Sequence, residues 1–489
     1  MTKTKGLKEY NLFVFAVLAL FIVLVLPTFL RFYSGNDSLI GSEPYYHLRV
    51  AKQLIQESSF NIFTPPEGIP DSSYSPREYF FNPYHYLLVF TSIFTSLANA
   101  SRVLPFILGL IAVLLFNNIL KSFVTEDYKR HIILMMLALS PAFIYTFTIS
   151  TPHSAAIVLS LAGFYFFMRK GRYNLVLSIL CFVVVALFSI FNTLLVIFLM
   201  LAYVLTKRQM QNRFIAFLFI LAVFSFANRV SFYYNYTFSP NLNIVSNMFS
   251  DLGGIIGFGI FGIALAVYGV ASHWKSKSSF MAFFFLSILL MLSLFLAGNV
   301  ANMYFAFFVA VAAGIGFVRL YEMSWNVQIV KRLTLLIIIC GILFSSVSYL
   351  NRLSSMEPDQ DMVDALVWLA DNTFKDRFVL SHYDEGYRIS TIARNPVIVD
   401  SLQTSEYDQK FLYKVQDSIF YSRKLNDVKP LFQVYNIQYI LVTPEMKSGL
   451  VWSKPDEGLL FLFTSKSTFK KVYGDTGVEI WEVLNSTRV

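Results

Sequence analysis

The sequence is poor in cysteine and in charge. Its only two cysteines, Cys181 and Cys340, lie inside apolar runs far apart in the chain. No CxxC pair and no Cys/His group occurs, so we infer neither a disulfide framework nor a zinc site. Charged residues make up 14% of the chain and hydrophobic residues 56%, far from the average of soluble proteins.

Charge is scarce mainly before residue 350, where long uncharged runs dominate, whereas residues 351–489 have an ordinary soluble composition. We therefore predict a membrane domain over 1–350 followed by a soluble domain over 351–489. The formal charge of +9 does not indicate nucleic acid binding. The basic residues stand in short loops between apolar runs, where they set membrane orientation. The first run, 11–30, lacks a small-residue cleavage site and is too long for a signal peptide, so we expect a retained span.

The apolar runs predict an α-helical polytopic membrane protein with about eleven spans, each able to cross roughly 30 Å of hydrocarbon. The expected spans are 11–30, 103–120, 132–149, 154–168, 173–188, 191–206, 214–230, 254–272, 279–297, 300–318 and 333–350. The uncharged run 173–206 is divided at Ser189–Thr193, and the run 279–318 at Gly298–Asn299.

The basic residues orient these spans. With the N-terminus inside, seventeen Lys and Arg residues fall in the inner segments, against Arg229 alone at the four short outer loops. Such a bias marks the inner side as cytoplasmic. It predicts a multi-pass protein of the cell membrane with an outer loop at 31–102 and an extracytoplasmic C-terminal domain. The stretch 83–101 contains an apolar segment too short to span, so we expect a helix at the outer interface there.

The C-terminal domain alternates helical and strand patterns, which indicates a mixed α/β fold. A helix is expected to end over 364–372. Short buried strands, rich in Val, Ile and Leu, are expected at 378–381, 396–400, 439–443 and 478–483.

Three polar clusters are candidates for chemistry. The first, residues 41–49, reads Gly-Ser-Glu-Pro-Tyr-Tyr-His-Leu-Arg. If a helix continues from Val50, Pro44 stands in its first turn and Glu43 at its start. A carboxylate beside basic groups suits metal and pyrophosphate chemistry. An interfacial helix with aromatic anchors explains the same residues.

The second cluster is Ser150-Thr151-Pro152-His153-Ser154, between two spans, and the third is residues 381–388 after a predicted strand. Polar residues at membrane depth are often functional, and a polar loop after a strand can bind a small ligand. A helix-breaking turn and a solvated turn are the alternatives. All three clusters fall on the predicted outer side, whereas random polar turns would divide between the two sides. This convergence favours one outward-facing site.

The first and third clusters resemble the signatures of oligosaccharyltransferase catalytic subunits, especially the archaeal type. Residues 43–49 are similar to the family's Asp-Pro-Tyr-Tyr-His-Leu-Arg, and residues 82–87, Asn-Pro-Tyr-His-Tyr-Leu, resemble its Pro-Pro-x-x-His-Tyr-Leu. Residues 382–386, His-Tyr-Asp-Glu-Gly, stand where the family has Trp-Trp-Asp-Tyr-Gly. Segments 364–368, 394–400 and 435–442 continue the match in order.

The resemblance implies a GT-C fold and transfer of sugar or glycan from a polyprenyl-(pyro)phosphate carrier to a protein or lipid acceptor, a protein asparagine among the candidates. It implies Glu43 and Asp384 as catalytic residues and a divalent cation, Mn²⁺ or Mg²⁺, at Glu43 and His153. The carrier phosphates are expected at the side chains of His47, Arg49, His85 and His153. The acceptor is expected at His382, Tyr383 and Asp384.

Several family positions differ here. The first-loop Asp is Glu43, and Thr151-Pro152-His153 stands where the family has an Asp-x-Asp motif. Asn247 takes the place of a loop Glu, and a basic residue that contacts the lipid phosphate is replaced near Asn302. Two membrane spans of the family are also missing from this sequence. The main alternative function is therefore a non-catalytic paralogue that binds a lipid-linked glycan or a partner protein. A transporter is disfavoured, because no inverted repeat is visible and the spans lack buried charge.

Overall fold

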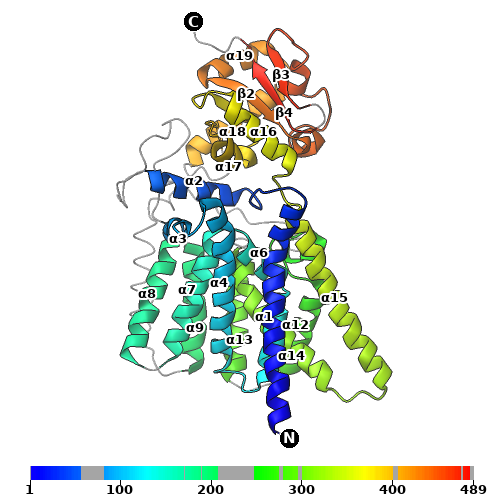
Figure 1. Cartoon of the computed structure of the whole chain (residues 1–489). Coiled ribbons are helices and arrows are strands. Elements are labelled where there is room, and N and C mark those ends of the chain that lie inside the picture. Colours follow the sequence, from blue (N-terminus) through cyan, green and yellow to red (C-terminus); the bar gives the residue numbers. More distant parts are fainter. Residues whose placement is uncertain are drawn as a thin grey trace.

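The computed structural model describes residues 2–56, 82–169, 171–188, 190–207, 247–274, 279–295, 300–399, 406–474 and 477–484. A bundle of long helices carries a small α/β domain at one end, and the N-terminus lies at the other end (Figure 1). We call the end of the bundle beneath the C-terminal domain the domain end. The side of the membrane on which each of these ends lies stays a prediction.

Helices coincide with ten of the expected spans. They are α1 (Thr2–Tyr33), α4 (Leu97–Leu120), α5 (Asp127–Ala138) with α6 (Pro141–Thr148), α7 (Pro152–Met168), α8 (Arg172–Phe188), α9 (Ile190–Lys207), α12 (Ile260–His273), α13 (Ser279–Phe295), α14 (Val300–Glu322) and α15 (Gln328–Ser354). Four of the described helices are long and apolar enough to cross a membrane alone, and the pair α5–α6 makes five. The expected span 214–230 lies outside the described residues, so the total of eleven stays a prediction.

The pair α5–α6 bends by 67° at its break. Pro141 is the first residue of α6. Proline has no backbone N–H and clashes with the preceding turn, so a straight helix cannot run through it. After the bend, α6 ends at Thr148 and α7 begins at Pro152. The second polar cluster therefore forms the connection between these two helices.

Helices α12 and α14 touch backbone to backbone. A Cβ on Gly269 would lie 2.0 Å from the Ala312 carbonyl oxygen, and one on Gly316 would lie 2.2 Å from that of Leu265. Small residues allow this approach in membrane bundles, where close packing replaces the hydrophobic driving force.

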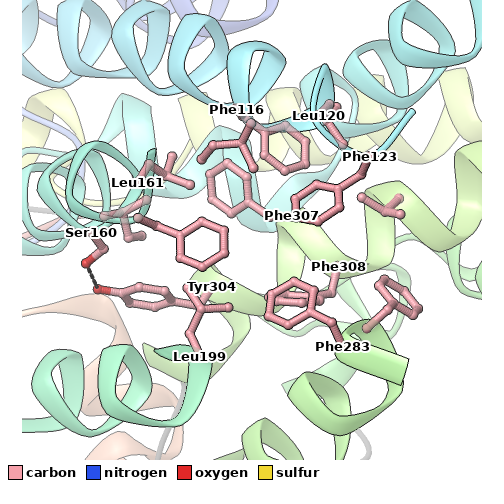
Figure 2. Close-up of a pocket in the computed structure, with 15 residues that line it drawn as sticks. Phe116, Leu120, Phe123, Ser160, Leu161, Leu199, Phe283, Tyr304, Phe307 and Phe308 are labelled. Carbon is pink, nitrogen blue, oxygen red and sulfur yellow. Dashed lines mark hydrogen bonds between the residues drawn. The ribbon is translucent and has the colours of Figure 1, made fainter. Parts of the chain in front are cut away.

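An apolar cavity of about 80 Å³ lies inside the bundle, between α4, α7, α9, α13 and α14. Figure 2 shows phenylalanine rings around it, with the hydrogen bond between Ser160 Oγ and Tyr304 OH (3.2 Å) at its wall. Its lining residues come from the helices that form the bundle core. The polar clusters contribute none of them, so this cavity is not the site that the sequence predicts.

The C-terminal domain contains the expected mixture of helices and sheet. Its strands are β1 (Phe378–Leu380), β2 (Ile437–Val442), β3 (Phe469–Tyr473) and β4 (Glu479–Val483), in the order β1-β2-β4-β3. Strand β1 is parallel to β2, and the other two pairs are antiparallel. The helices that accompany the sheet are α16 (Gln360–Asn372), α18 (Glu406–Tyr421) and α19 (Leu425–Val434).

Two strand predictions need correction. In the expected strand 396–400, the described residues 396–399 form no strand: Val397 forms an isolated bridge with Val379, whose N–H donates to the Pro396 carbonyl at 2.9 Å. Strand β3 was not predicted, because Lys470 and Lys471 interrupt its apolar alternation. In the structure Lys471 Nζ lies 2.7 Å from Glu479 Oε1 on the neighbouring strand, so the sheet accommodates its charge.

We expect Gly316→Ala to destabilise the protein by roughly 1–3 kcal/mol, because the added methyl group meets a backbone carbonyl that cannot move aside. Gly262→Ala in α12 is the matched control, since a Cβ there has no neighbour within 4 Å. It should be neutral or stabilise by up to about 1 kcal/mol through helix propensity. The measurement is thermal unfolding of both variants in the same detergent. Equal unfolding temperatures would contradict the close α12–α14 contact.

Candidate functional site

The first polar cluster begins helix α2 (Glu43–Gln56), as the sequence predicts. Figure 1 shows α2 lying across the domain end, between the bundle and the C-terminal domain. Glu43 is its first residue, a position where the helix dipole favours a carboxylate. A second short helix, α3 (Pro83–Ser92), follows in the chain and ends before α4. The stretch 83–101 therefore forms a separate short helix plus the first turn of a span.

Helices α2 and α3 meet through two imidazoles. His47 Nδ1 lies 2.9 Å from His85 Nε2, and both side chains are buried. On α3, the neighbouring Tyr84 is also buried, and its hydroxyl shares a hydrogen bond of 2.8 Å with Ser150 Oγ. Helix α3 thus connects the first polar cluster to the second.

Glu43 faces imidazoles from both clusters. His47 Nε2 lies 3.6 Å from Glu43 Oε1, and His153 at the start of α7 interacts with the same carboxylate electrostatically. Asn192 Nδ2 lies 3.4 Å from His153 Nδ1 and so orients that ring. We call Glu43, His47, His85 and His153 the Glu43 cluster. The Glu43 side chain keeps 39% of its surface accessible, which leaves it open to an incoming group.

The surroundings shift the pKa values of Glu43 and His85. Burial raises the pKa of Glu43, but the attraction of the nearby His47, with the charge of His153, outweighs it, and the net pKa is lowered. Burial, and secondarily the charge of His47, lower the pKa of His85 well below its ordinary value. The cluster therefore combines an ionised carboxylate with a neutral imidazole at neutral pH.

The opposite face of α2 contacts the C-terminal domain through the helical segment η4 (Ile389–Ala393). Arg49 Nη1 donates to Ser390 Oγ at 2.7 Å, and Thr391 Oγ1 donates to the Tyr45 carbonyl at 2.9 Å. His47 and Arg49, both expected at the carrier phosphates, thus contact different parts of the protein.

Arg388 anchors the same region with two carboxylates. Its guanidinium lies 2.5 Å from Glu357 and 2.6 Å from Glu385. The Glu357 carbonyl also accepts from the Gly41 N–H at 2.9 Å, just before α2. Burial raises the pKa of Glu385 to about 7; the charge of Arg388 opposes this shift and that of Glu357 adds to it.

The residues expected at the acceptor sit elsewhere on this domain. His382 Nδ1 lies 3.4 Å from Asp384 Oδ2, and the Tyr383 ring packs 5.0 Å from that of Tyr413 on α18. These described contacts stay within the C-terminal domain. The structure brings the first two polar clusters together, whereas the third divides: its later residues lead into η4 beside α2, and its earlier ones lie against α18.

The residues present do not fit a divalent metal site. In the described part of the chain, no three side chains of His, Cys, Asp or Glu are grouped to hold an ion. Thr151 and His153 replace the family's second-loop carboxylates, and the neighbours of Glu43 are imidazoles, whereas Mg²⁺ prefers oxygen ligands. The transfer steps that we propose for this protein therefore involve no metal.

No family model matches the sequence, and no curated protein matches it significantly. The archaeal oligosaccharyltransferase AglB from Archaeoglobus fulgidus, in complex with an inhibitory peptide and a dolichol-phosphate, matches with a TM-score of 0.65 at 15% identity, over 98% of this chain and 75% of that chain. The protein has a GT-C fold. ArnT from Cupriavidus metallidurans matches with a TM-score of 0.55 at 10% identity in the apo state, over 98% of each chain.

A second ArnT structure, bound to undecaprenyl phosphate, gives a TM-score of 0.54 at 12% identity, over 98% of this chain and 99% of that chain. At such identities the likeness establishes the GT-C fold alone. It confirms the resemblance read from the first and third clusters, and the low identity agrees with a divergent chain.

Sequence reasoning missed three residues of this site. Asn192 is fully buried beside His153, and Tyr84 and Ser150 join α3 to the second cluster. One signal was present for Asn192: it falls in the predicted break of the uncharged run 173–206, where a polar side chain needs a partner. Tyr84 and Ser150 lie inside quoted motifs, but nothing in their spacing indicates that they touch.

The raised pKa of Glu385 predicts a pH-dependent stability. A carboxyl whose folded pKa exceeds its unfolded value, about 4.3, stabilises the fold when protonated. That contribution is complete below the unfolded pKa and is lost as the pH rises through about 7. We expect Glu385→Gln, which mimics the protonated form, to match the parent closely at about pH 4, below the unfolded pKa, and to unfold at a higher temperature at about pH 8.

Glu357→Gln is the matched control, because Glu357 contacts the same guanidinium but its side chain is 40% exposed. It should not raise the unfolding temperature at pH 8. A Glu385→Gln variant less stable than the parent at pH 8 would show that the ion pair outweighs the burial of Glu385.

Proposed function

We propose that this GT-C protein transfers a sugar or glycan from a polyprenyl-(pyro)phosphate carrier to an acceptor at the domain end. The observation that carries the proposal is the Glu43 cluster: a carboxylate with a lowered pKa, surrounded by imidazoles, at the junction of α2, α3 and α7. Similar folds carry dolichol-phosphate in AglB and undecaprenyl phosphate in ArnT, which supports a lipid-linked donor.

The transfer needs a base and a site for the leaving phosphate. In this proposal the Glu43 carboxylate accepts the proton of the acceptor's N–H or O–H group as the acceptor atom bonds to the anomeric carbon. The bond between that carbon and the phosphate oxygen breaks, and the phosphate departs with the electron pair. Its growing charge is stabilised by N–H donors of His47 and His153.

Arg49 keeps its expected role at the carrier phosphate as part of this proposal, whereas His85 contributes through its contact with His47. A guanidinium binds phosphate in two-pronged fashion, and the bond of Arg49 to Ser390 is one that a phosphate oxygen can replace. We assign the acceptor to the surface formed by His382, Tyr383 and Asp384, where the Asp384 side chain is 50% exposed. The protein asparagine suggested by the family is one candidate acceptor.

The second candidate function is lipid-linked glycan binding without turnover. The replacement of the family's second-loop carboxylates by Thr151 and His153 favours it, because the metal site is then incomplete. The two functions differ in one observable: both bind the carrier, but only the transferase releases free polyprenyl phosphate.

We expect Glu43→Gln to lower the transfer rate by about 10²–10⁴-fold, because the amide cannot accept the proton. The measurement is release of polyprenyl phosphate from a synthetic lipid-linked sugar by purified protein, with acceptor peptide or lipid, with and without EDTA. Glu445→Gln is the control, since Glu445 is an exposed carboxylate of the C-terminal domain and should leave the rate unchanged.

Three results would contradict parts of this proposal. Undiminished transfer by Glu43→Gln would remove Glu43 from the reaction. Donor binding without any release by the parent protein would favour the non-catalytic function. Complete loss of transfer with EDTA, restored by Mn²⁺ or Mg²⁺, would show that the metal of the resemblance is retained after all.

A further inference from the structure

We propose that His85 is a positioning residue, which holds His47 in the tautomer that carries its proton on Nε2 and directs that N–H to the Glu43 carboxylate. The structural part of the inference stands on geometry alone. Its kinetic consequence rests on the proposed function.

The contact between the two rings allows one of two arrangements. At 2.9 Å, one of the two nitrogens, His47 Nδ1 or His85 Nε2, must carry the hydrogen and the other must accept it. If His85 donates, a neutral His47 has its own proton on Nε2. If His47 donates, a neutral His47 presents the Nε2 lone pair instead.

Glu43 decides between these arrangements. His47 Nε2 lies 3.6 Å from Glu43 Oε1, so this nitrogen faces a carboxylate. A lone pair there would repel the carboxylate oxygen, whereas an N–H attracts it. Donation from His85 to His47 is therefore the arrangement that suits His85, His47 and Glu43 together.

Packing holds the two rings in this relation. Their centroids lie 5.1 Å apart, and Tyr84 and Tyr46 pack edge-on against the His47 ring at 5.5 and 5.1 Å. Both imidazoles are buried, so a ring flip would have to displace these neighbours. Burial lowers the pKa of His85 well below its ordinary value, so the His85 ring is neutral and has a single N–H to donate.

The His47 Nε2 atom is itself buried and has no hydrogen-bond partner. A buried donor without a partner costs free energy. At 3.6 Å the carboxylate is near, but beyond hydrogen-bond range. An oxygen of the carrier phosphate, arriving beside Glu43, would complete this bond. His85 thus prepares a donor for an incoming anion.

The first test is the tautomer itself. Full-length protein labelled with ¹⁵N-histidine has six histidines, and His47→Gln identifies the signal of His47 by its loss. We expect a His47 ring protonated at Nε2 and bare at Nδ1. A ring protonated at Nδ1 would overturn the proposal. This measurement needs neither substrate nor a variant at His85.

The second test uses paired substitutions at His85. His85→Gln places an amide donor near the position of Nε2, whereas His85→Leu removes the donor at similar size. We expect His85→Leu to leave the His47 ring free to adopt either tautomer. It should lower kcat on the order of 10²-fold with little change in the KM for the sugar donor. Gln should restore both the tautomer and most of kcat. His273→Leu, at the end of α12, is the control and should behave as the parent.

These outcomes distinguish a failure of the proposed transfer function from a failure of the positioning role of His85. A parent protein that transfers no sugar contradicts the proposed function, but the ¹⁵N spectra still decide the role of His85. An unchanged tautomer in His85→Leu, or a His85→Gln variant as impaired as His85→Leu, would overturn the positioning role even where transfer is confirmed.

Discussion

Helix α2 is held from both faces, and the site depends on that restraint. On the bundle side, the 2.9 Å contact between His47 and His85 joins α2 to α3. On the other side, Arg49 and Tyr45 bond to the segment η4 of the C-terminal domain. Glu43 is the first residue of this helix, so its carboxylate is placed by contacts with both parts of the protein. The C-terminal domain therefore contributes to the geometry of a site whose acid lies in the first loop.

A carboxylate partly buried beside a membrane bundle requires compensating donors, because a charge drawn away from water is costly unless it is paired. In the family that the sequence resembles, a metal ion supplies that compensation. Here the groups nearest to Glu43 are the imidazoles of His47 and His153. Imidazoles provide N–H donors without fixed charge, and their donor pattern is set by a second partner, His85 for one ring and Asn192 for the other. The same arrangement that satisfies Glu43 would also receive a phosphate oxygen.

Much of the fold followed from patterns that local physics determines. Apolar runs gave ten of the helix positions, Pro44 and Glu43 marked the start of α2, and short buried runs indicated three of the four strands. The failures have physical causes. Lys470 and Lys471 hide a strand in which Lys471 pairs across the sheet with Glu479, and residues 396–399 are apolar because they are buried rather than because they pair in a ladder. For the site, sequence indicated which polar segments converge. Which atoms meet, such as Asn192 with His153, depends on helix packing that no local pattern encodes.

The central claim is that the Glu43 cluster receives the phosphate of a lipid carrier. The most direct measurement is an experimental structure of the full chain with a polyprenyl phosphate bound. The account predicts a phosphate oxygen at hydrogen-bond distance, roughly 3 Å, from His47 Nε2 and beside the Glu43 carboxylate. A phosphate bound at another place, with His47 Nε2 still without a partner, would contradict it.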